Sequence, residues 1–298
     1  MDIVDELRAF VATAQTGSFS AAGEQLGLSN RLTSKYVAAL EARLGTRLFQ
    51  RTTRQVGLTP AGQDLLARAP SVLDDLDALL AEVSETRRGL TGTLRIAAPV
   101  TFGELYLAGM LARFAADHTA LTLDLRLSDR HEDLAREGID LAFRMGEPDL
   151  LSLKARRLGT FRSVAVASPA YLARHATPDT PETLAEHSCI VDTNRRQPRR
   201  WRFLKDGVER TAEIGGRLQV NSARAAAELA AGGHGIAYPP RFAVCAALES
   251  GTLVPVLRDF EGESGPLNAV YLEGRTLPRK VRALIDFAVA DLRQADIL

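Results

Sequence analysis

The stretch from residue 17 to residue 62 constrains the fold of this chain more than any other part. Its apolar spacing predicts a short helix over 18–26, a tight turn, and a longer helix from Ser29 to Leu44. Ser29 can cap the longer helix, because its hydroxyl accepts a backbone N–H of the first turn, and Gly45 suits the left-handed residue that ends a helix. Two helices joined by a three-residue turn form a helix-turn-helix unit.

The longer helix has an apolar face and a polar face. The residues that are expected to pack inward are Thr33, Val37, Leu40 and Leu44. The opposite face carries Asn30, Arg31, Ser34, Lys35 and Ala38. Such a face is typical of a recognition helix, whose first turns meet base edges in the major groove while small residues let the backbone come close.

Basic residues are concentrated around this helix. Residues 29–54 contain one acid, Glu41, and six basic side chains: Arg31, Lys35, Arg43, Arg47, Arg51 and Arg54. Because the formal net charge of the whole chain is +0, this local excess favours contact with the phosphates of a nucleic acid. The alternative interpretation is an amphipathic helical hairpin whose basic face is solvated.

A wing is predicted directly after the helix-turn-helix unit. Residues 48–51 predict a short strand, 52–54 a turn and 55–58 a returning strand. In this arrangement Arg51 and Arg54 are directed at the DNA backbone or the minor groove.

This stretch closely resembles the N-terminal domain of LysR-type transcriptional regulators, through the residues SFSAAGEQLGLS…SKYVAALEARLGTRLFQRTTRQVGLTPAG. The resemblance implies a winged helix-turn-helix domain that binds DNA, and the candidate contacts are Ser29, Asn30, Arg31, Ser34, Lys35, Arg51 and Arg54. The chain has Asn30 where the family usually has glutamine, Arg31 where it has a small residue or proline, and Thr33 where it has an aliphatic residue. The family's base preference is therefore not carried over.

The composition indicates a globular cytoplasmic protein. A length of 298 residues suits about two domains, and 46% hydrophobic residues with 25% charged residues are ordinary for this class. Cys189 and Cys245 stand in no metal-ligand spacing, so reduced thiols are expected. The N-terminal residues lack the pattern of a signal peptide, and no apolar run approaches the ~18 residues of a membrane span.

A long helix is predicted after the wing, with Thr59 as its N-cap and Pro60 at its first position. Its apolar residues follow steps of four and three, a heptad pattern formed by Leu65, Ala69, Val72, Leu76, Leu79 and Val83. This seam predicts a dimer through a second copy of the helix, as in the family, which often builds tetramers from such dimers. Pro70 predicts a kink or two helical segments, because proline removes one backbone hydrogen bond. The alternative is a helix packed on its own chain.

Beyond residue 92 strands and helices alternate, which predicts an α/β fold with a parallel sheet. The predicted elements include strands over 93–98, 121–127, 139–144, 162–168 and 267–272, helices over 102–116, 132–136, 223–231 and 279–294, and a glycine-rich loop over 262–265. Asp206 and Gly207 predict a hairpin turn.

The family's effector domain has this form, two α/β lobes joined by two crossings, and resembles periplasmic solute-binding proteins. We therefore expect a winged helix-turn-helix domain over 1–58, a linker and dimerisation helix over 59–88, and an effector-binding domain over 92–298. Within it, lobe I takes residues 92–161 and 267–298, and lobe II takes residues 162–266.

No catalytic or metal-binding constellation is predicted. None of the five histidines stands at a metal-ligand spacing with another histidine or cysteine: His118, His131, His175, His187 and His234. The sequence has no phosphate-binding glycine loop after a strand and no nucleophile elbow, so neither an enzyme nor a cofactor is expected. The basic run 195–200 is interpreted as a solvated loop, with DNA contact as the alternative.

A ligand is expected beyond the carboxyl ends of the strands, as is usual in such sheets. The residues expected to face one crevice, and to contact the effector, are Thr101, Ser128, Arg144, Asn221 and Ser222. Thr101 and Glu104 also form the T-x-x-E pattern of a capping box. Two helix N-termini and the guanidinium of Arg144 favour a small organic anion, most of all a carboxylate. A structural ion pair is the alternative role of Arg144.

Together these features predict a sequence-specific transcription regulator of the LysR type whose activity is modulated by a small effector bound between two lobes. Its expected partners are double-stranded DNA with an inverted-repeat operator, the effector and further copies of itself, and RNA polymerase is another candidate. The alternatives are a cytoplasmic small-molecule-binding α/β protein with an incidental helical domain, and an architectural DNA-binding protein with a vestigial ligand lobe.

Overall fold

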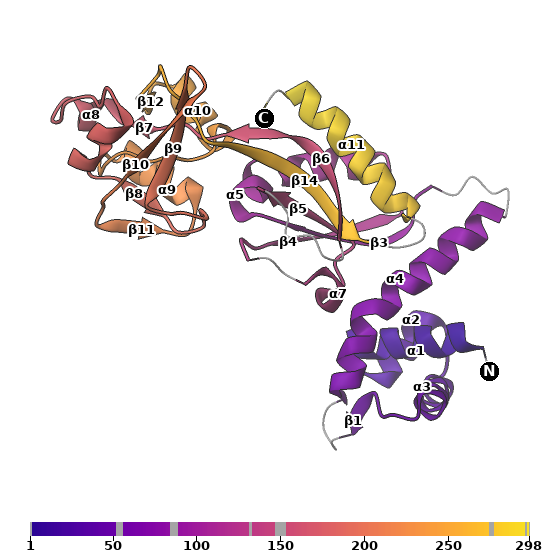
Figure 1. Ribbon diagram of the computed structural model, residues 1–298. Helices are drawn as coiled ribbons and strands as arrows, with labels where there is room; N and C mark the ends of the chain where they lie inside the picture. Colours follow the sequence, from indigo (N-terminus) through magenta and orange to yellow (C-terminus); the bar gives the residue numbers. More distant parts are fainter. Residues whose placement is uncertain are drawn as a thin grey trace.

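Three parts follow one another along the chain in the computed structural model: a group of N-terminal helices, a long helix, and an α/β region with two lobes (Figure 1). The structure describes residues 2–51, 56–83, 89–130, 133–146, 153–273, 277–295 and 297. The N-terminal helices and the two lobes have separate hydrophobic cores. Among the helices of these residues, none is long and apolar enough to cross a membrane.

The N-terminal helices form as the sequence predicts. They are α1 (Ile3–Thr16), α2 (Phe19–Leu26) and α3 (Asn30–Leu44). Their shared core includes Phe10 and Leu40. The Ser29 hydroxyl accepts the N–H of Leu32 at 3.3 Å, and Gly45 ends α3 with a φ of 66°. The predicted cap and the predicted helix end are therefore confirmed.

The two strands of the predicted wing are present. They are β1 (Phe49–Arg51) and β2 (Val56–Leu58), which pair antiparallel, while the turn residues 52–55 lie outside the described residues. The start of the wing is fixed by Glu41, whose Oε1 atom accepts the N–H groups of Leu48 at 2.8 Å and Phe49 at 3.2 Å. A buried carboxylate thus satisfies two buried backbone donors where the chain leaves α3.

The linker helix α4 (Pro60–Val83) begins at the predicted cap, where the Thr59 hydroxyl accepts the N–H of Gly62 at 3.0 Å. It continues through Pro70 as one helix, so the alternative of two segments is wrong.

The heptad seam of α4 has two environments. Leu65 and Ala69 pack into the core of the N-terminal helices, because α4 lies against α1. Further along, Val72 and Leu79 are 57% and 56% exposed. The first half therefore packs on its own chain, as the alternative interpretation held, and the second half leaves apolar side chains uncovered within the described residues.

Lobe I is built on a five-stranded sheet with the order β4-β3-β5-β14-β6. The strands are β3 (Gly92–Ala98), β4 (Leu121–Leu127), β5 (Leu141–Met145), β6 (Leu153–Arg162) and β14 (Ser264–Leu272). β3 runs parallel to β4 and β5, but β14 runs antiparallel to β5 and β6. The prediction of a parallel sheet is confirmed for β3, β4 and β5, but the sheet as a whole is mixed, because β14 returns from lobe II and inserts between β5 and β6.

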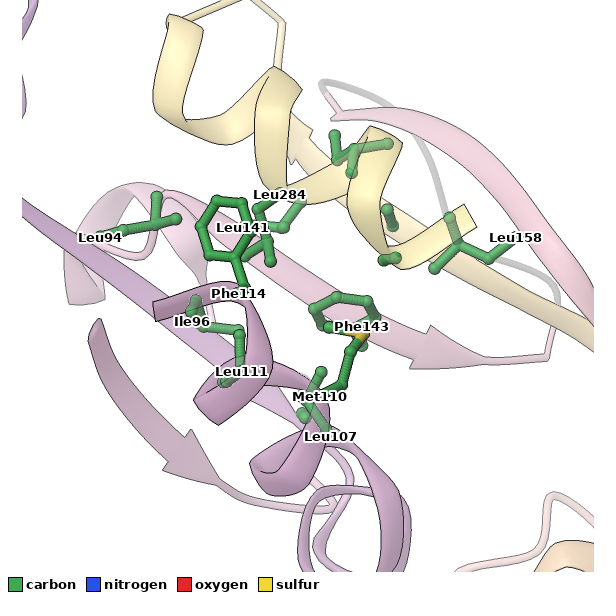
Figure 2. Close-up of a cluster of buried hydrophobic side chains, with 14 of the residues drawn as sticks. Leu94, Ile96, Leu107, Met110, Leu111, Phe114, Leu141, Phe143, Leu158 and Leu284 are labelled. Atoms are coloured by element: carbon green, nitrogen blue, oxygen red, sulfur yellow. The ribbon is translucent and has the colours of Figure 1, made fainter. Parts of the chain in front are cut away.

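Helices cover both faces of this sheet. On one face, α6 (Ala108–Ala116) and α11 (Arg279–Ala295) enclose the largest core, where Phe114, Phe143 and Leu284 meet (Figure 2). α6 continues the short α5 (Val100–Phe102) and a π-helical turn, η1 (Gly103–Leu107).

The short helix α7 (Leu134–Glu137) covers the other face and also contacts α4. It ends at Gly138, which has a φ of 64°, and a Cβ atom there would lie 2.6 Å from the carbonyl oxygen of Ala67 in α4. Glycine is needed at this position for two reasons, its backbone conformation and the approach of the linker helix.

Lobe II consists of small sheets and short helices. Its strands are β7 (Val166–Ala167), β8 (Ile190–Asp192), β9 (Arg200–Lys205), β10 (Val208–Glu213), β11 (Leu218–Val220), β12 (Val254–Pro255) and β13 (Glu261–Gly262). Its helices are α8 (Pro169–Leu172), η2 (Pro181–Glu186), α9 (Ala223–Ala231), η3 (Arg241–Ala243) and α10 (Cys245–Glu249). The predicted hairpin is confirmed, with positive φ values at Asp206 and Gly207 between β9 and β10.

Two corrections concern the crossings, which are the two segments where the chain passes between the lobes, one after β6 and one between β13 and β14. The strand predicted over 162–168 is instead the end of the long β6 followed by β7. The segment 262–265, predicted as a glycine-rich loop, forms the second crossing, where β13 passes into β14. Both crossings are extended because their backbone groups pair within and between the sheets.

Candidate nucleic-acid interface and ligand cleft

The polar face of α3 points away from the core, as predicted. Asn30, Arg31, Lys35 and Ala38 are exposed and Ser34 is half-buried, whereas Thr33, Val37 and Leu40 are buried. The prediction for Leu44 is wrong, because its side chain is 47% exposed and lies outside the core at the end of α3. Ser29, which is exposed at the start of α3, completes the surface available to a groove.

Two members of the basic patch have structural partners. Arg43 binds both carboxylate oxygens of Glu6, at 3.1 and 3.3 Å, and Arg47 binds Glu41 at 3.1 Å. Glu6 and Glu41 are buried, so these two arginines pair with acids of the N-terminal domain itself. Glu6 lies outside the segment whose charges were counted, so the sequence did not reveal its pairing.

The outward cations of α3 are Arg31 and Lys35. The side chain of Arg51 and the whole of Arg54 lie outside the described residues, so their contacts with DNA stay predictions.

A cleft of about 770 Å³ lies between the lobes. Thr101, Ser128 and Arg144 line it, near the carboxyl ends of β3, β4 and β5. Asn221 and Ser222 do not belong to its lining. The Ser222 hydroxyl instead accepts the N–H of Ala225 and so caps α9.

The helix start at Thr101 also differs from the prediction. The capping box is wrong, because α5 already begins at Val100 and Thr101 lies inside its first turn. The N–H of Val100 is donated to Asp129 Oδ1 at 3.1 Å, and Asp129 Oδ2 accepts the side-chain amide of Asn194 in lobe II at 2.8 Å. A resident carboxylate therefore occupies this helix N-terminus and ties the two lobes together.

A second contact joins the lobes nearby. Glu104 accepts a hydrogen bond from Arg224 of α9 at 3.4 Å, and the Phe102 ring packs edge-on against Phe242 of η3, with centroids 5.8 Å apart. Phe242 thereby reaches the core of lobe I from lobe II.

Cations outnumber anions along the cleft. Its lining contains three carboxylates, those of Asp129, Asp192 and Glu263, and six arginines: Arg130, Arg144, Arg195, Arg196, Arg200 and Arg202. Burial raises the pKa of Asp192 above its ordinary value.

The basic run 195–200 supplies three of these arginines. The interpretation as a solvated loop holds for Arg196, Arg199 and Arg200, which are exposed, whereas Arg195 is half-buried. The run follows directly after β8, so the rule about the carboxyl ends of strands identifies it as a part of the cleft in lobe II.

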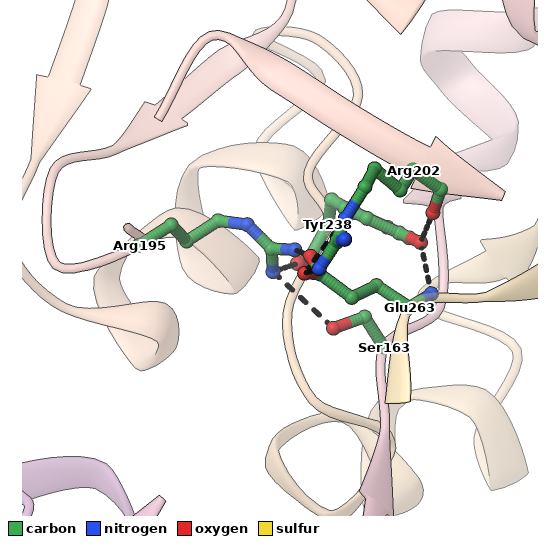
Figure 3. A network of polar contacts seen from close by, with 5 residues as sticks. All are labelled: Ser163, Arg195, Arg202, Tyr238 and Glu263. Carbon is green, nitrogen blue, oxygen red and sulfur yellow. Dashed lines mark hydrogen bonds and ion pairs between the residues drawn. The ribbon is translucent and has the colours of Figure 1, made fainter. Parts of the chain in front are cut away.

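Arg195 and Arg202 belong to a network at the crossings (Figure 3). Both guanidiniums bind the carboxylate of Glu263, and Arg195 also donates to Ser163 Oγ at 3.2 Å and to the Tyr238 carbonyl at 3.0 Å. The Tyr238 hydroxyl donates to the Arg202 carbonyl at 2.5 Å and accepts the N–H of Glu263 at 2.6 Å. Burial, the largest cause, raises the pKa of this phenol.

This network holds the two crossings together. The N–H of Ser163, just after β6, donates to the Glu263 carbonyl at 2.8 Å. A Cβ atom on Gly262 would lie 1.9 Å from the Ser163 carbonyl oxygen, so the two backbones touch at a point where only glycine fits.

Three of the histidines lie outside the cleft lining. His175 stacks on Tyr171, His187 contacts the hydroxyl of Tyr171, and His234 is exposed outside the cleft lining. Across the described residues no group of three histidine, cysteine or acidic side chains could hold a metal ion. Cys189 is a buried thiol, and burial raises its pKa to about 12.

Comparison with known proteins finds matches to both parts of the chain. The model described as "LysR substrate binding domain" matches residues 87–293, and the model described as "Bacterial regulatory helix-turn-helix protein, lysR family" matches residues 4–63.

Relatives match along nearly the whole chain. The transcriptional regulator PtxR of Pseudomonas aeruginosa is 36% identical over 283 residues, which cover 95% of this chain and 91% of PtxR. The solved structure of CrgA from Neisseria meningitidis is 32% identical with a TM-score of 0.63, covering 96% of this chain and 98% of CrgA. The full-length structure of AphB, a virulence activator of Vibrio cholerae, is 27% identical with a TM-score of 0.61, covering 97% of this chain and 99% of AphB.

Proposed function

Because this chain belongs to the LysR family of transcriptional regulators, with their DNA-binding and effector-binding domains, we propose that it binds an inverted-repeat operator as an oligomer and responds to a small organic anion. The relatives are transcriptional regulators, which supports regulation rather than catalysis as its activity, and we place this activity in the cytoplasm as part of the proposal.

The outward face of α3 supports the DNA contacts. Arg31 is exposed in the first turn, where a recognition helix meets base edges, and a guanidinium can bind a guanine through two hydrogen bonds. Lys35, one turn further, is placed for a phosphate, and Ser29, Asn30 and Ser34 offer neutral polar groups. Arg51 and Arg54 of the wing are the proposed contacts with the backbone or the minor groove.

The exposed half of the α4 seam supports assembly. The resemblance to the family implies oligomers, and Val72 and Leu79, which are one heptad apart on α4, are both exposed among the described residues. A second copy of α4 would cover them and place two recognition helices on half-sites related by about one helical turn of DNA. A tetramer of two such dimers is the larger assembly that we propose.

The observation that carries the anionic effector is the excess of arginines in the cleft. Six guanidiniums and three carboxylates line the cleft. Asp129 is engaged at a helix start, Glu263 pairs with Arg195 and Arg202, and Arg200 pairs with Glu213 at 3.8 Å. Thr101 and Ser128 add neutral hydroxyls that would orient a bound carboxylate. A cleft of about 770 Å³ suits a small metabolite.

The test is binding of the full chain to a labelled fragment of its own upstream region, with and without candidate organic acids. Arg31→Ala should lower affinity by ~10-fold or more and relax preference for the native site, because one bidentate base contact discriminates by ~1–3 kcal/mol. Arg217→Ala, on the exposed surface of lobe II, is the matched control and should bind like the unmodified chain. Retained affinity and preference in Arg31→Ala would show that α3 does not read the DNA.

A further inference from the structure

The crossing network carries an unbalanced charge (Figure 3). Arg195 and Arg202 are two cations that converge on the single carboxylate of Glu263. Ser163 is neutral, and the phenol of Tyr238 stays protonated because burial raises its pKa. The five residues therefore hold one excess positive charge, shared by Arg195, whose side chain is 14% exposed, and Arg202, whose side chain is 49% exposed. A positive charge as little exposed as that of Arg195 is stabilised by a nearby anion.

The two guanidiniums also have unused donors. A guanidinium offers five N–H groups in a fixed plane. Arg195 uses three of them, two on Nη1 for Ser163 and the Tyr238 carbonyl and one on Nη2 for Glu263. Arg202 uses two, one on Nε and one on Nη2, both for Glu263. In the described part of the chain no other acceptor contacts the remaining donors, and both arginines line the cleft.

The helix N-termini are weaker candidates for the same anion. Asp129 already accepts the first N–H of α5, and Ser222 already caps α9. A carboxylate arriving there would meet a resident negative charge in the first case and a satisfied cap in the second. The crossing network, by contrast, has a positive excess and donors to spare.

We propose that Arg195 and Arg202 form a carboxylate-binding subsite where the two crossings join the lobes, and that the effector's carboxylate shares these guanidiniums with Glu263. Glu263 shows that the two guanidiniums are arranged to receive a carboxylate, since its own oxygens lie on both of them. The inference rests on the proposed anionic effector and adds the residues that hold its charge.

The subsite predicts effects of opposite sign for two isosteric or conservative changes. Arg202→Gln removes one cation and leaves Arg195 and Glu263 balanced, so carboxylates should bind at least ~10-fold more weakly. Glu263→Gln removes the resident anion and leaves two cations, so carboxylates should bind several-fold more tightly, at least ~3-fold. Arg202→Lys keeps the charge without the planar fork and should fall between the unmodified chain and Arg202→Gln.

The experiment titrates the full chain and each variant with acetate, succinate and benzoate, and with the corresponding amides, at constant ionic strength in a calorimeter. Arg217→Gln serves as a control for surface charge, and Arg196→Gln as a control for charge at the cleft without a place in the network. Circular dichroism and Trp201 fluorescence confirm that each variant is folded. Expected are preference for carboxylates over amides, weakening in Arg202→Gln, strengthening in Glu263→Gln, and smaller changes in both controls.

Two results would overturn the proposal, and they are distinguishable. If carboxylates bind the unmodified chain but Arg202→Gln and Glu263→Gln behave like Arg196→Gln, the anion binds elsewhere in the cleft and only the subsite is wrong. If no carboxylate binds in preference to its amide, the anionic effector and the subsite are both wrong. An unfolded Arg202→Gln leaves Arg202→Lys and Glu263→Gln to decide, because affinities that rank against the predicted order contradict the subsite.

Discussion

Replacement of Glu41 by methionine tests how the wing is attached to the recognition helix. Glu41 is 7% exposed, and its Oε1 atom accepts the N–H groups of Leu48 and Phe49. Leu48 and Phe49 are both buried. Methionine has a similar length but no strong acceptor, so Glu41→Met leaves two buried amides without a partner. In the unfolded chain both amides bind water, and the change therefore acts on the folded state.

The expected cost follows from these contacts. A buried donor without an acceptor costs ~1–3 kcal/mol, and because the two amides share one oxygen the pair should cost ~2–4 kcal/mol. The ion pair with Arg47 adds close to nothing, since Arg47 is largely exposed. A loss of ~2–4 kcal/mol raises the local opening equilibrium by ~30- to 900-fold. Glu41→Gln keeps a carbonyl acceptor and should lose less than ~1 kcal/mol.

Hydrogen–deuterium exchange of the full chain measures this opening directly. A peptide that spans residues 45–51 should exchange ~30-fold faster or more in Glu41→Met than in the unmodified chain, and only slightly faster in Glu41→Gln. A peptide from β9 in lobe II provides the internal reference. Exchange in Glu41→Met within about threefold of Glu41→Gln would refute the argument that the acceptor, rather than the packing volume, fixes the wing.

Two further predictions concern assembly and pH. Val72→Asp combined with Leu79→Asp should reduce the light-scattering mass to that of one chain, 32.3 kDa, whereas Leu204→Asp, an exposed leucine of lobe II, should leave the oligomer intact; an unchanged mass in the double variant would remove α4 from the interface. Burial lowers the pKa of His187 below its ordinary value of 6.5, so the unfolded chain binds the proton more readily and stability is lost as the pH falls below that value. Thermal unfolding followed by Trp201 fluorescence should therefore shift to lower temperature in acid, and this shift should shrink in His187→Gln; an equal shift in both proteins would exclude His187 as its source.

Short-range rules predicted much of the fold. The cap at Ser29, the helix end at Gly45 and the hairpin turn at Asp206 and Gly207 depend on neighbouring residues, so the sequence contains all the information that they need. The wing strands and the recognition face of α3 follow for the same reason.

Contacts between distant residues were beyond such rules. The capping box at Thr101 failed because the acceptor at the helix start is Asp129, 29 residues from Val100, and local spacing cannot anticipate a carboxylate that follows the next strand, β4. The sheet is parallel only over β3, β4 and β5, because β14 returns from the other lobe and runs antiparallel to β5. The roles of Arg195 and Glu263, 68 residues apart, required the crossings to be brought together in space.

The close fit between Gly138 and Ala67 gives α7 a mechanical property. Leu134 at the start of this four-residue helix lines the ligand cleft, while Gly138 at its end abuts the backbone of α4. Even one methyl group at Gly138 would collide with the Ala67 carbonyl, so the two backbones are in close contact here. A movement of α7 toward α4 would therefore displace α4. A short, stiff spacer therefore separates the wall of the cleft from the helix that carries the DNA-binding domain.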